Sequence, residues 1–326
     1  MAWTPVLPEA VPHTPATADA LLMPLTHLAV LEASGADATA FLHAQLSNDV
    51  QGLPADRSRL AGYCNAKGRL YAVPRLWRMD DRWQLVLPAD TADAVLKRLR
   101  MFVLRSRVAL HRREDVSLLG VAGPRAADCL RQAGLPVPGE VDTVVARGET
   151  SILRLPAPIE RFALCVPDGE AAALWAALAG TATAAPAAAW LLLDIDAGLP
   201  TIYAATLESF VPQMVNLERV GGVSFRKGCY PGQEIVARMH YLGKPSRRMY
   251  RLRAAGATPT AGSAVLDAAG HEVGTVVDAA PAAAGCRLLA VLQVTAAEDG
   301  LRLPDGQPLE RLPLPYALDD AAEAAG

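Results

Sequence analysis

The sequence predicts an α+β fold that ends in a separate, smaller β-rich domain. Helical and strand patterns do not alternate strictly along the first 245 residues, and short apolar runs broken by Gly, Pro and Asp follow them. At 326 residues, the chain can bury a sizeable core in each of two domains. Its composition, 52% hydrophobic and 20% charged, is typical of a globular protein.

Charge and cysteine usage exclude several classes of protein. The net charge of −3 gives no overall attraction to nucleic acid or to an anionic membrane, so we expect neither as a direct partner. No Lys or Arg precedes Arg57, so we expect neither a secretory signal nor a mitochondrial transit peptide, both of which need basic residues. The most apolar run, 184–193, is too short to span a bilayer. The five cysteines are widely spaced, which favours a reducing compartment and argues against a metal site. We therefore expect a cytoplasmic protein, and nothing demands more than a monomer.

Residues 1–24 are rich in Pro, Ala and Thr, and we expect them to form a flexible arm. The elements expected after the arm are a strand at 25–32, a helix within 34–50, strands at 58–64, 69–78 and 82–87, a helix at 91–102, strands at 105–111 and 116–122, a helix at 124–133, strands at 141–147, 150–155 and 161–166, and a helix at 169–179. The order of strand, helix, several strands and helix occurs twice. It indicates an internal duplication, although the two halves share no visible sequence identity.

The pattern changes next to Lys244 and Pro245, where we place the domain boundary. Segments such as GSAVLDAAGHEVGTVVDA and CRLLAVLQV show no helical period and contain turn residues. We therefore expect a small antiparallel barrel or sandwich at 246–318 and a disordered tail at 319–326.

The stretch SFRKGCYPGQEIVARMHYLGKPSRRM, residues 224–249, concentrates unusual chemistry. It contains two of the four lysines of the chain, and Lys227 stands two residues from Cys229. Pro and Gly at 231–232 favour a tight turn, after which Gln233 and Glu234 open an expected helix. A cysteine beside a lysine and before a helix N-terminus is favoured as a thiolate. The alternative, a structural turn with a small buried cysteine, stays open.

Two further segments carry polar residues next to apolar runs. YCNAKGRLY, 63–71, favours a hairpin turn that contains Lys67, either as a ligand group or simply in solvent. WLLLDIDAGLPTI, 190–202, places Asp194 and Asp196 at the end of a buried run, either to grip a polar ligand edge or to end the element. The basic residues Arg238, Lys244, Arg247 and Arg248 form either a positive rim for a polyanion or, as we favour, a solvated face.

Several motifs in order along residues 35–245 resemble one family. FLHAQLSNDV, NAKGRL, DIDAGLP and FVPQMVNLERVGGVSFRKGCYPGQE are similar to the folate-binding YgfZ family, relatives of the glycine-cleavage T-protein (aminomethyltransferase). The resemblance implies a duplicated T-protein-like folate-binding domain at 25–245, with tetrahydrofolate or a one-carbon derivative at its centre. It also implies that the C-terminal domain is a small antiparallel β-barrel.

The resemblance also implies site residues. Lys227 and Cys229 correspond to the functional, catalytic pair of the family motif. Asp196 lies where T-proteins use a glutamate on the pterin edge. The remaining residues implied for cofactor binding are Asn65, Lys67, Gln213, Asn216, Tyr230, Gln233, Glu234 and Arg238.

The implied function is an accessory role in assembling or repairing iron–sulfur clusters. Its partners would be iron–sulfur enzymes or cluster carriers, with effects on cluster-dependent tRNA-modifying enzymes. T-proteins carry a pair of aspartates where this chain has Ala72 and Val73, and neither side chain can transfer a proton, so we do not expect aminomethyl transfer. The alternatives are a folate-dependent aminomethyltransferase or demethylase, and a non-catalytic interaction module without folate.

Overall fold

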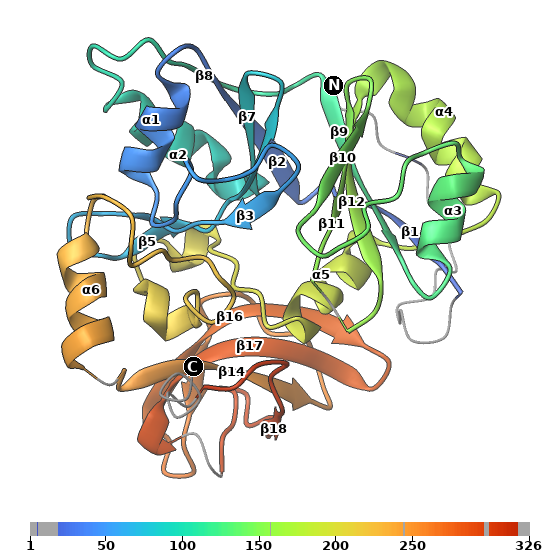
Figure 1. Cartoon of the computed structure of the whole chain (residues 1–326). Helices are drawn as coiled ribbons and strands as arrows, with labels where there is room; N and C mark the ends of the chain where they lie inside the picture. The colour runs from blue at the N-terminus through green and yellow to red at the C-terminus, as the bar shows by residue number, and fades with distance from the viewer. Residues whose placement is uncertain (1–4, 6–18, 157, 244, 297–299, 319–326) are drawn as a thin grey trace.

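The chain folds into three large sheets with helices packed against them (Figure 1). The structure is a computed structural model, and it describes residue 5 and residues 19–156, 158–243, 245–296 and 300–318. Two of the sheets lie side by side at the top of Figure 1, and the third lies below them. Within the described residues, helices and sheets are mixed and all strand pairings but one are antiparallel, which confirms the expected α+β class.

The first sheet is antiparallel and has five strands in the order β3-β6-β7-β2-β8. Its strands are β2 (Leu28–Ser34), β3 (Ser58–Leu60), β6 (Arg75–Met79), β7 (Arg82–Pro88) and β8 (Ala109–Arg112). Helices α1 (Ala38–Gln45) and α2 (Ala89–Arg100) pack on it. Apolar side chains of both helices, including Phe41 and Leu96, share one core with Leu85 of β7.

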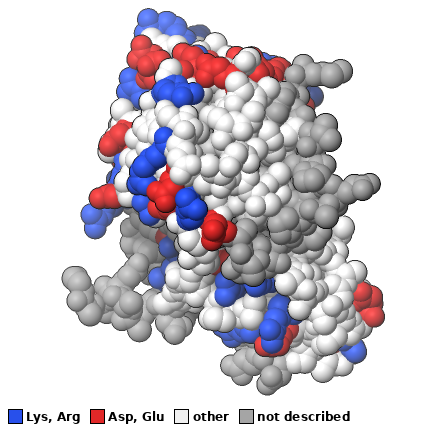
Figure 2. Space-filling view, turned by 90° about the vertical axis from the view of Figure 1, so that its right-hand side faces the viewer, with Lys and Arg blue, Asp and Glu red and all other residues white. Residues whose placement is uncertain are grey.

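The second sheet has six strands in the order β10-β11-β12-β9-β1-β13. Its strands are β1 (Leu21–Pro24), β9 (Val116–Ala122), β10 (Val144–Arg147), β11 (Thr150–Arg154), β12 (Arg161–Pro167) and β13 (Thr183–Ala184). Helices α3 (Ala126–Gln132) and α4 (Asp168–Ala179) cover it. The exposed positions of α4 at 172, 173, 176 and 177 are all alanine, and the side of the molecule that carries α3 and α4 is largely uncharged (Figure 2).

The two sheets repeat one strand order and exchange one strand each. The order β3-β6-β7-β2-β8 matches β10-β11-β12-β9-β1, and all of these pairings are antiparallel. Strand β1 leads into β2 but pairs with β9, whereas β8 leads into β9 but pairs with β2. Each half therefore completes the sheet of the other, so the two halves are interlocked. The repeated order agrees with the repeat seen in the sequence, and a common origin of the halves stays a prediction.

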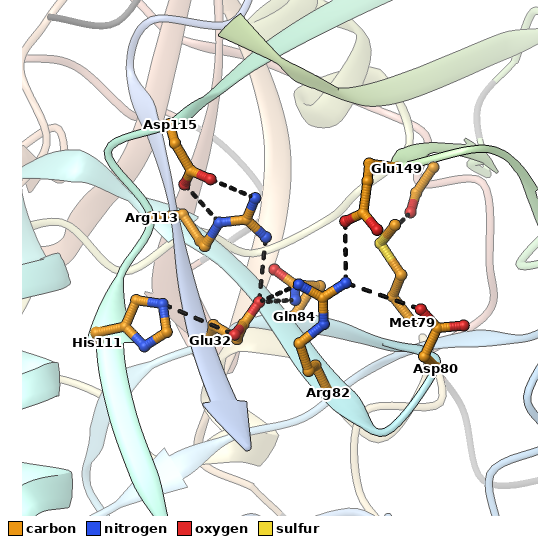
Figure 3. Close-up of polar contacts among 10 residues, drawn as sticks. Glu32, Met79, Asp80, Arg82, Gln84, His111, Arg113, Asp115 and Glu149 are labelled. Carbon is orange, nitrogen blue, oxygen red and sulfur yellow. Dashed lines mark hydrogen bonds and ion pairs between the residues drawn. The ribbon is translucent and has the colours of Figure 1, made fainter.

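An ion-pair network centred on the buried Glu32 lies where the two sheets meet (Figure 3). Glu32 of β2 accepts hydrogen bonds from Gln84 Nε2 at 2.7 Å and from Arg113 Nη1 at 3.1 Å. Arg82 Nη1 lies 3.7 Å from the same carboxylate, and its Nη2 donates to Glu149 Oε2 at 2.9 Å. Glu149 belongs to the turn between β10 and β11, so this network ties the first sheet to the second.

The third sheet is antiparallel, with five strands in the order β15-β16-β17-β14-β18. Its strands are β14 (Arg247–Ala254), β15 (Ala264–Leu266), β16 (Glu272–Ala282), β17 (Gly285–Gln293) and β18 (Glu310–Leu312). Within the described residues β15 and β18 do not pair with each other, and single bridges at Leu266–Arg302 and Arg302–Pro308 lie between them. The expected closed barrel is therefore not confirmed, because both edge strands are only three residues long.

The segments that connect the sheets lie largely between them in Figure 1, with α6 at the left edge of the molecule. Helix α5 packs on β16 and β17. The connecting elements are the hairpin of β4 (Tyr63–Cys64) and β5 (Leu70–Ala72), α5 (Ala187–Asp196), the 3-10 turns η1 (Ala204–Thr206) and η2 (Pro212–Val215), and α6 (Gln233–Leu242). A third 3-10 turn, η3 (Val294–Ala296), follows β17 within the C-terminal part of the chain.

The structure differs from the sequence analysis at several places. The strand expected at 58–64 is divided into β3 and β4, which belong to different sheets, and of the strand expected at 105–111 only the end forms β8. Leu21–Pro24, expected in the flexible arm, form β1, because Leu21 and Leu22 are fully buried in the second sheet. The strand expected at 69–78 is split into β5 and β6 by Pro74, which cannot donate a ladder hydrogen bond. The apolar run that ends in Asp194 and Asp196 is helix α5. The rest of the expected arm, apart from residues 5 and 19–20, and the tail at 319–326 lie outside the described residues.

Candidate functional site

The KGCYPGQE loop packs directly on the turn between β4 and β5. Gly232 has a φ of +80°, and a Cβ added there would lie 2.4 Å from Asn65 O and 2.5 Å from Gly68 Cα. Gly68 also has a positive φ, +71°, and its added Cβ would lie 3.3 Å from Gly232 O. Both positions need glycine, because the two backbones approach too closely for side chains. Two segments whose glycines, Gly68 and Gly232, are 164 residues apart in the sequence thus form one structure.

Asn65 builds the β4–β5 turn from within. Its Oδ1 accepts hydrogen bonds from Lys67 N at 2.8 Å and from Arg69 N at 3.0 Å. Its Nδ2 donates to Glu208 Oε2 at 2.6 Å. The expected hairpin is therefore present, the Asn65 amide is used by the protein itself, and the Lys67 side chain is exposed.

Lys227 anchors the motif loop to the end of helix α1. Its Nζ donates to the carbonyl oxygens of Leu46, at 2.7 Å, and His43. These carbonyls belong to the last turn of α1, where helix geometry leaves acceptors unsatisfied and favours a cation. Nζ also lies 5.1 Å from the ring centre of Tyr230. Burial lowers the pKa of Lys227 to about 8, with Asp49 and Cys229 pulling it upward.

Cys229 is the exposed thiol of the chain. All five cysteines are free, and the other four, Cys64, Cys129, Cys165 and Cys286, are buried. Cys229 precedes α6 by four residues, and the neighbouring Tyr230 side chain is buried beneath the loop. Burial raises the pKa values of Cys64 and Cys165 to about 12, which keeps those thiols protonated. Among the five thiols, Cys229 is therefore the one that an external reagent or partner can reach.

The other motif residues hold the loop or face solvent. Gln213 Nε2 donates to Val236 O in α6, and Asn216 Nδ2 donates to Met249 O in β14, both at 2.7 Å. These bonds join η2 to the helix and to the third sheet. Gln233 opens α6, and Glu234 and Arg238 are exposed on it. Their role in cofactor binding stays a prediction.

A separate cavity lies between the two upper sheets and α5. Its volume is about 100 Å³. Its walls are mainly leucine and valine side chains together with Trp77 and Trp190, and its polar members are Arg75, Asp194 and Thr201. An apolar slot with a few polar groups is the usual form of a small-molecule site.

Asp194 is the carboxylate of this cavity. Its Oδ1 accepts from Arg161 Nη2 at 2.8 Å, and Arg161, which is fully buried, lies over the Trp190 ring at 4.8 Å. Trp77 Nε1 is buried and has no hydrogen-bond partner among the described residues. Burial lowers the pKa of His27 to about 4 even though Asp194 pulls it upward. The cavity wall therefore combines a carboxyl acceptor, Asp194, with a donor, Trp77 Nε1, that the described residues leave unused.

Asp196, the residue expected on the pterin edge, turns the other way. Its carboxylate pairs with Arg251, at 3.5 Å, and with Arg287 of the third sheet. Residues two apart on an α-helix point about 200° away from each other, so Asp194 faces the cavity and Asp196 faces the sheet. None of the residues expected to bind the cofactor lines the cavity, and Asp194 is the nearby carboxylate that does. Knowing that this run is a helix would have identified it.

The third sheet supplies a second buried carboxylate next to the cavity. Asp278 Oδ2 accepts from Tyr203 Oη at 3.0 Å, and burial raises the pKa of Asp278 to about 7. Asp194 raises it further, whereas hydrogen bonds from Tyr203 and from Thr201, a cavity residue, lower it. Burial and the neighbouring Asp194 therefore favour the protonated form of Asp278.

The positions that carry aspartates in T-proteins are apolar in the structure as well. Ala72 is fully buried at the end of β5, and Val73 forms part of the cavity wall. The hairpin of β4 and β5 therefore connects the motif loop at its turn with the cavity at its far end. No group of three or more His, Cys, Asp or Glu side chains that could hold a metal ion occurs in the described ranges.

Comparisons with known proteins agree with this arrangement. Residues 12–137 match the family described as the GCVT N-terminal domain. The solved glycine cleavage system aminomethyltransferase T from Bartonella henselae superposes with a TM-score of 0.73 at 22% identity, over 92% of this chain and 86% of that one. The tRNA-modifying protein YgfZ of Klebsiella pneumoniae is 35% identical over 98% of this chain and 100% of its own. That of Serratia proteamaculans is 34% identical over 96% of both.

The fold and the central cavity define a protein with the glycine cleavage T-protein fold. Sequence identity along nearly the whole chain is more specific. The chain belongs to the YgfZ family, whose curated members here are named tRNA-modifying proteins, so the resemblance seen in the motifs is confirmed. In the described part of the chain, no helix combines the length and apolarity needed to cross a bilayer, and the expected compartment stays a prediction.

Proposed function

We propose that the chain binds tetrahydrofolate, or a one-carbon derivative of it, in the cavity between the two upper sheets. The pterin of folate is a flat ring system whose amino-pyrimidine edge donates hydrogen bonds. The cavity offers apolar walls, two tryptophans and the Asp194 carboxylate, which suits such an edge. Trp77 Nε1 and Thr201 supply further polar contacts there. When bound, folate supplies the chemistry of carrying a one-carbon group.

The wall of the cavity argues against aminomethyl transfer. That reaction needs a group that takes or gives a proton beside the folate. Ala72 and Val73 stand where T-proteins have aspartates, and they contribute only methyl groups. We therefore assign the chain a binding and accessory role.

The accessory role that we propose is the assembly or repair of iron–sulfur clusters, in support of cluster-dependent enzymes such as tRNA-modifying enzymes. The observation that carries it is the exposed Cys229 thiol, held on a loop that Lys227 anchors and that joins the cavity through the β4–β5 hairpin. A thiol in this position can contact a cluster, a cluster carrier or an oxidised species. Its partners would be iron–sulfur enzymes or cluster carriers.

Calorimetric titration with tetrahydrofolate tests the binding site. Trp77→Phe keeps an aromatic ring in the cavity wall but removes the N–H, and we expect about tenfold weaker binding. Trp175→Phe, on α4 away from the cavity, is the matched control and should bind like the wild type. If Asp196→Ala weakens tetrahydrofolate binding and Trp77→Phe leaves the affinity unchanged, the binding site lies at Asp196 instead of in the cavity. Neither heat nor competition by folinic acid would favour an interaction module without folate.

Complementation tests the thiol. In cells that lack the wild-type protein, Cys229→Ser should fail to restore the activities of iron–sulfur enzymes. The same purified variant should still bind tetrahydrofolate, which separates thiol chemistry from loss of fold. Full restoration by Cys229→Ser would show that the thiol is dispensable.

The shared fold favours one rival function, a folate-dependent one-carbon transferase or demethylase. An assay of the purified protein with an aminomethyl donor and tetrahydrofolate decides it. Formation of methylenetetrahydrofolate at a catalytic rate would replace the accessory role with an enzymatic one.

A further inference from the structure

A second hollow, apart from the central cavity, lies beside helix α6. Its volume is about 900 Å³, and it is bordered by residues of the 218–226 segment, the C-terminal half of α6 and the start of β14. It shares no lining residue with the cavity between the sheets. Phe225 and Arg226 belong to the same loop as Cys229, so the loop that carries the exposed thiol also lines the hollow.

The lining of this hollow is cationic although the chain as a whole is acidic. Four arginines line it, Arg59, Arg219, Arg226 and Arg248, against a single carboxylate, Glu218. Glu218 is already paired with Arg248, which also donates to Gln213 O at 2.9 Å. Arg226 is exposed and has no hydrogen-bond or ion-pair partner among the described residues. The local excess of positive charge contrasts with the net charge of −3 and suits a polyanion.

Aromatic rings stand on the α6 side of the same hollow. Phe225 and His240 stack with ring centres 3.7 Å apart and planes within 10°. Tyr241 meets both rings edge-on, at 6.2 Å from Phe225 and 4.7 Å from His240. Tyr241 is 66% exposed, although a large aromatic side chain on a monomer is usually better covered. Its ring surface is available to a planar ligand.

We propose that this hollow binds a nucleotide, either free or as a unit of a single strand of nucleic acid. Exposed arginines beside stacking aromatic rings are the combination that holds a phosphate and a base together. An inorganic anion would use the arginines and leave the rings without a role. The volume is ample for one nucleotide. This inference revises the expectation from net charge, because recognition depends on the local surface.

Fluorescence anisotropy with a labelled ten-nucleotide single-stranded RNA, and calorimetry with AMP and ATP, test the proposal. We expect binding at low salt, and about tenfold weaker binding in Arg226→Ala and in Tyr241→Ala. The salt dependence separates the two roles, because Arg226→Ala should reduce the slope of log affinity against log salt by about 0.7, whereas Tyr241→Ala should leave it unchanged. Arg105→Ala and Phe102→Ala, exposed side chains outside the hollow, are the matched controls.

The result also identifies the source of the nucleotide. Affinity that rises with strand length indicates nucleic acid, and AMP or ATP that competes at similar concentrations indicates a free nucleotide. The proposal is overturned if RNA, AMP and ATP all fail to bind, or if inorganic phosphate competes equally and Tyr241→Ala has no effect. Equal losses in the two controls would overturn it too. Tetrahydrofolate binding should persist in the Arg226 and Tyr241 variants, so the test of the nucleotide site is independent of the test of the folate site.

Discussion

The molecule has two contacts between distant segments that are built in opposite ways, and each of them is called a joint below. The first joint lies where the two upper sheets meet, and there the Glu32 carboxylate contacts Gln84, Arg82 and Arg113 (Figure 3). The second joint lies where the motif loop meets the β4–β5 turn, and there Gly68 and Gly232 allow the two backbones to come into direct contact. The first joint satisfies its own charges and leaves nothing for a ligand. The second holds its loop by shape, so Cys229 and Arg226 on the same loop stay unused by the fold.

Gly232→Ala breaks the second joint and should have the largest effect. The new Cβ would meet Asn65 O at 2.4 Å, and a φ of +80° is unfavourable for alanine. We expect a loss of about 4 kcal/mol in the free energy of unfolding, from strain and overpacking together, measured by urea denaturation.

Gly148→Ala is the matched control for that variant. Gly148 also has a positive φ, +58°, but a Cβ there would meet nothing within 4 Å. Its loss should be about 1 kcal/mol, from backbone strain alone. Equal losses in both variants would mean that the contact between the two loops adds nothing beyond strain.

Glu32→Gln breaks the first joint. The amide leaves Arg113 and Arg82 without a shared buried carboxylate, although each keeps another partner, Asp115 and Glu149. We expect a loss of about 3 kcal/mol in the free energy of unfolding. The control is Glu310→Gln, which breaks the exposed pair with Arg253 and should cost less than about 1 kcal/mol. A cost as small as that of the control would show that the network is not a joint.

The two joints also differ in how much of each could be predicted from the sequence. The sequence predicted the two turns of the second joint, because glycine, a turn and a helix start are local signals at Gly68 and Gly232, but it did not predict that the turns pack together. The first was not, because Glu32 and Arg113 meet only through the register of β2 with β8, and Arg82 meets Glu149 only through the packing of two sheets. The carboxylate of the cavity was missed for a related reason. Asp194 and Asp196 are equivalent until the helix that separates their faces is known.

Lys227→Met tests the charged part of the second joint. Removing the two hydrogen bonds to the end of α1 should cost about 1 kcal/mol at pH 7. Burial lowers the pKa of Lys227 to about 8, below its usual value of 10.5, so between these pH values the unfolded chain binds more protons than the folded one. The free energy of unfolding of the wild type should therefore rise, relative to the variant, from pH 8 to pH 10.5.

The exposed Lys67 provides the comparison for that measurement. Lys67→Met should change the free energy of unfolding by less than about 0.5 kcal/mol. Urea denaturation at several pH values checks both variants. A difference between wild type and Lys227→Met that falls over this pH range would contradict the buried position of the amine.

Cys229 should contribute least to stability and most to reactivity. Its side chain is exposed, so Cys229→Ser should change the free energy of unfolding by less than about 0.5 kcal/mol. In the folded protein, iodoacetamide should label Cys229 and spare the four buried cysteines, which should react only after unfolding, as peptide mass spectrometry can show. Comparable labelling of Cys64 or Cys165 in the folded state, or a large loss of stability in the serine variant, would place the thiol within the fold. Selective labelling with unchanged stability would instead show that the second joint is built to present this thiol.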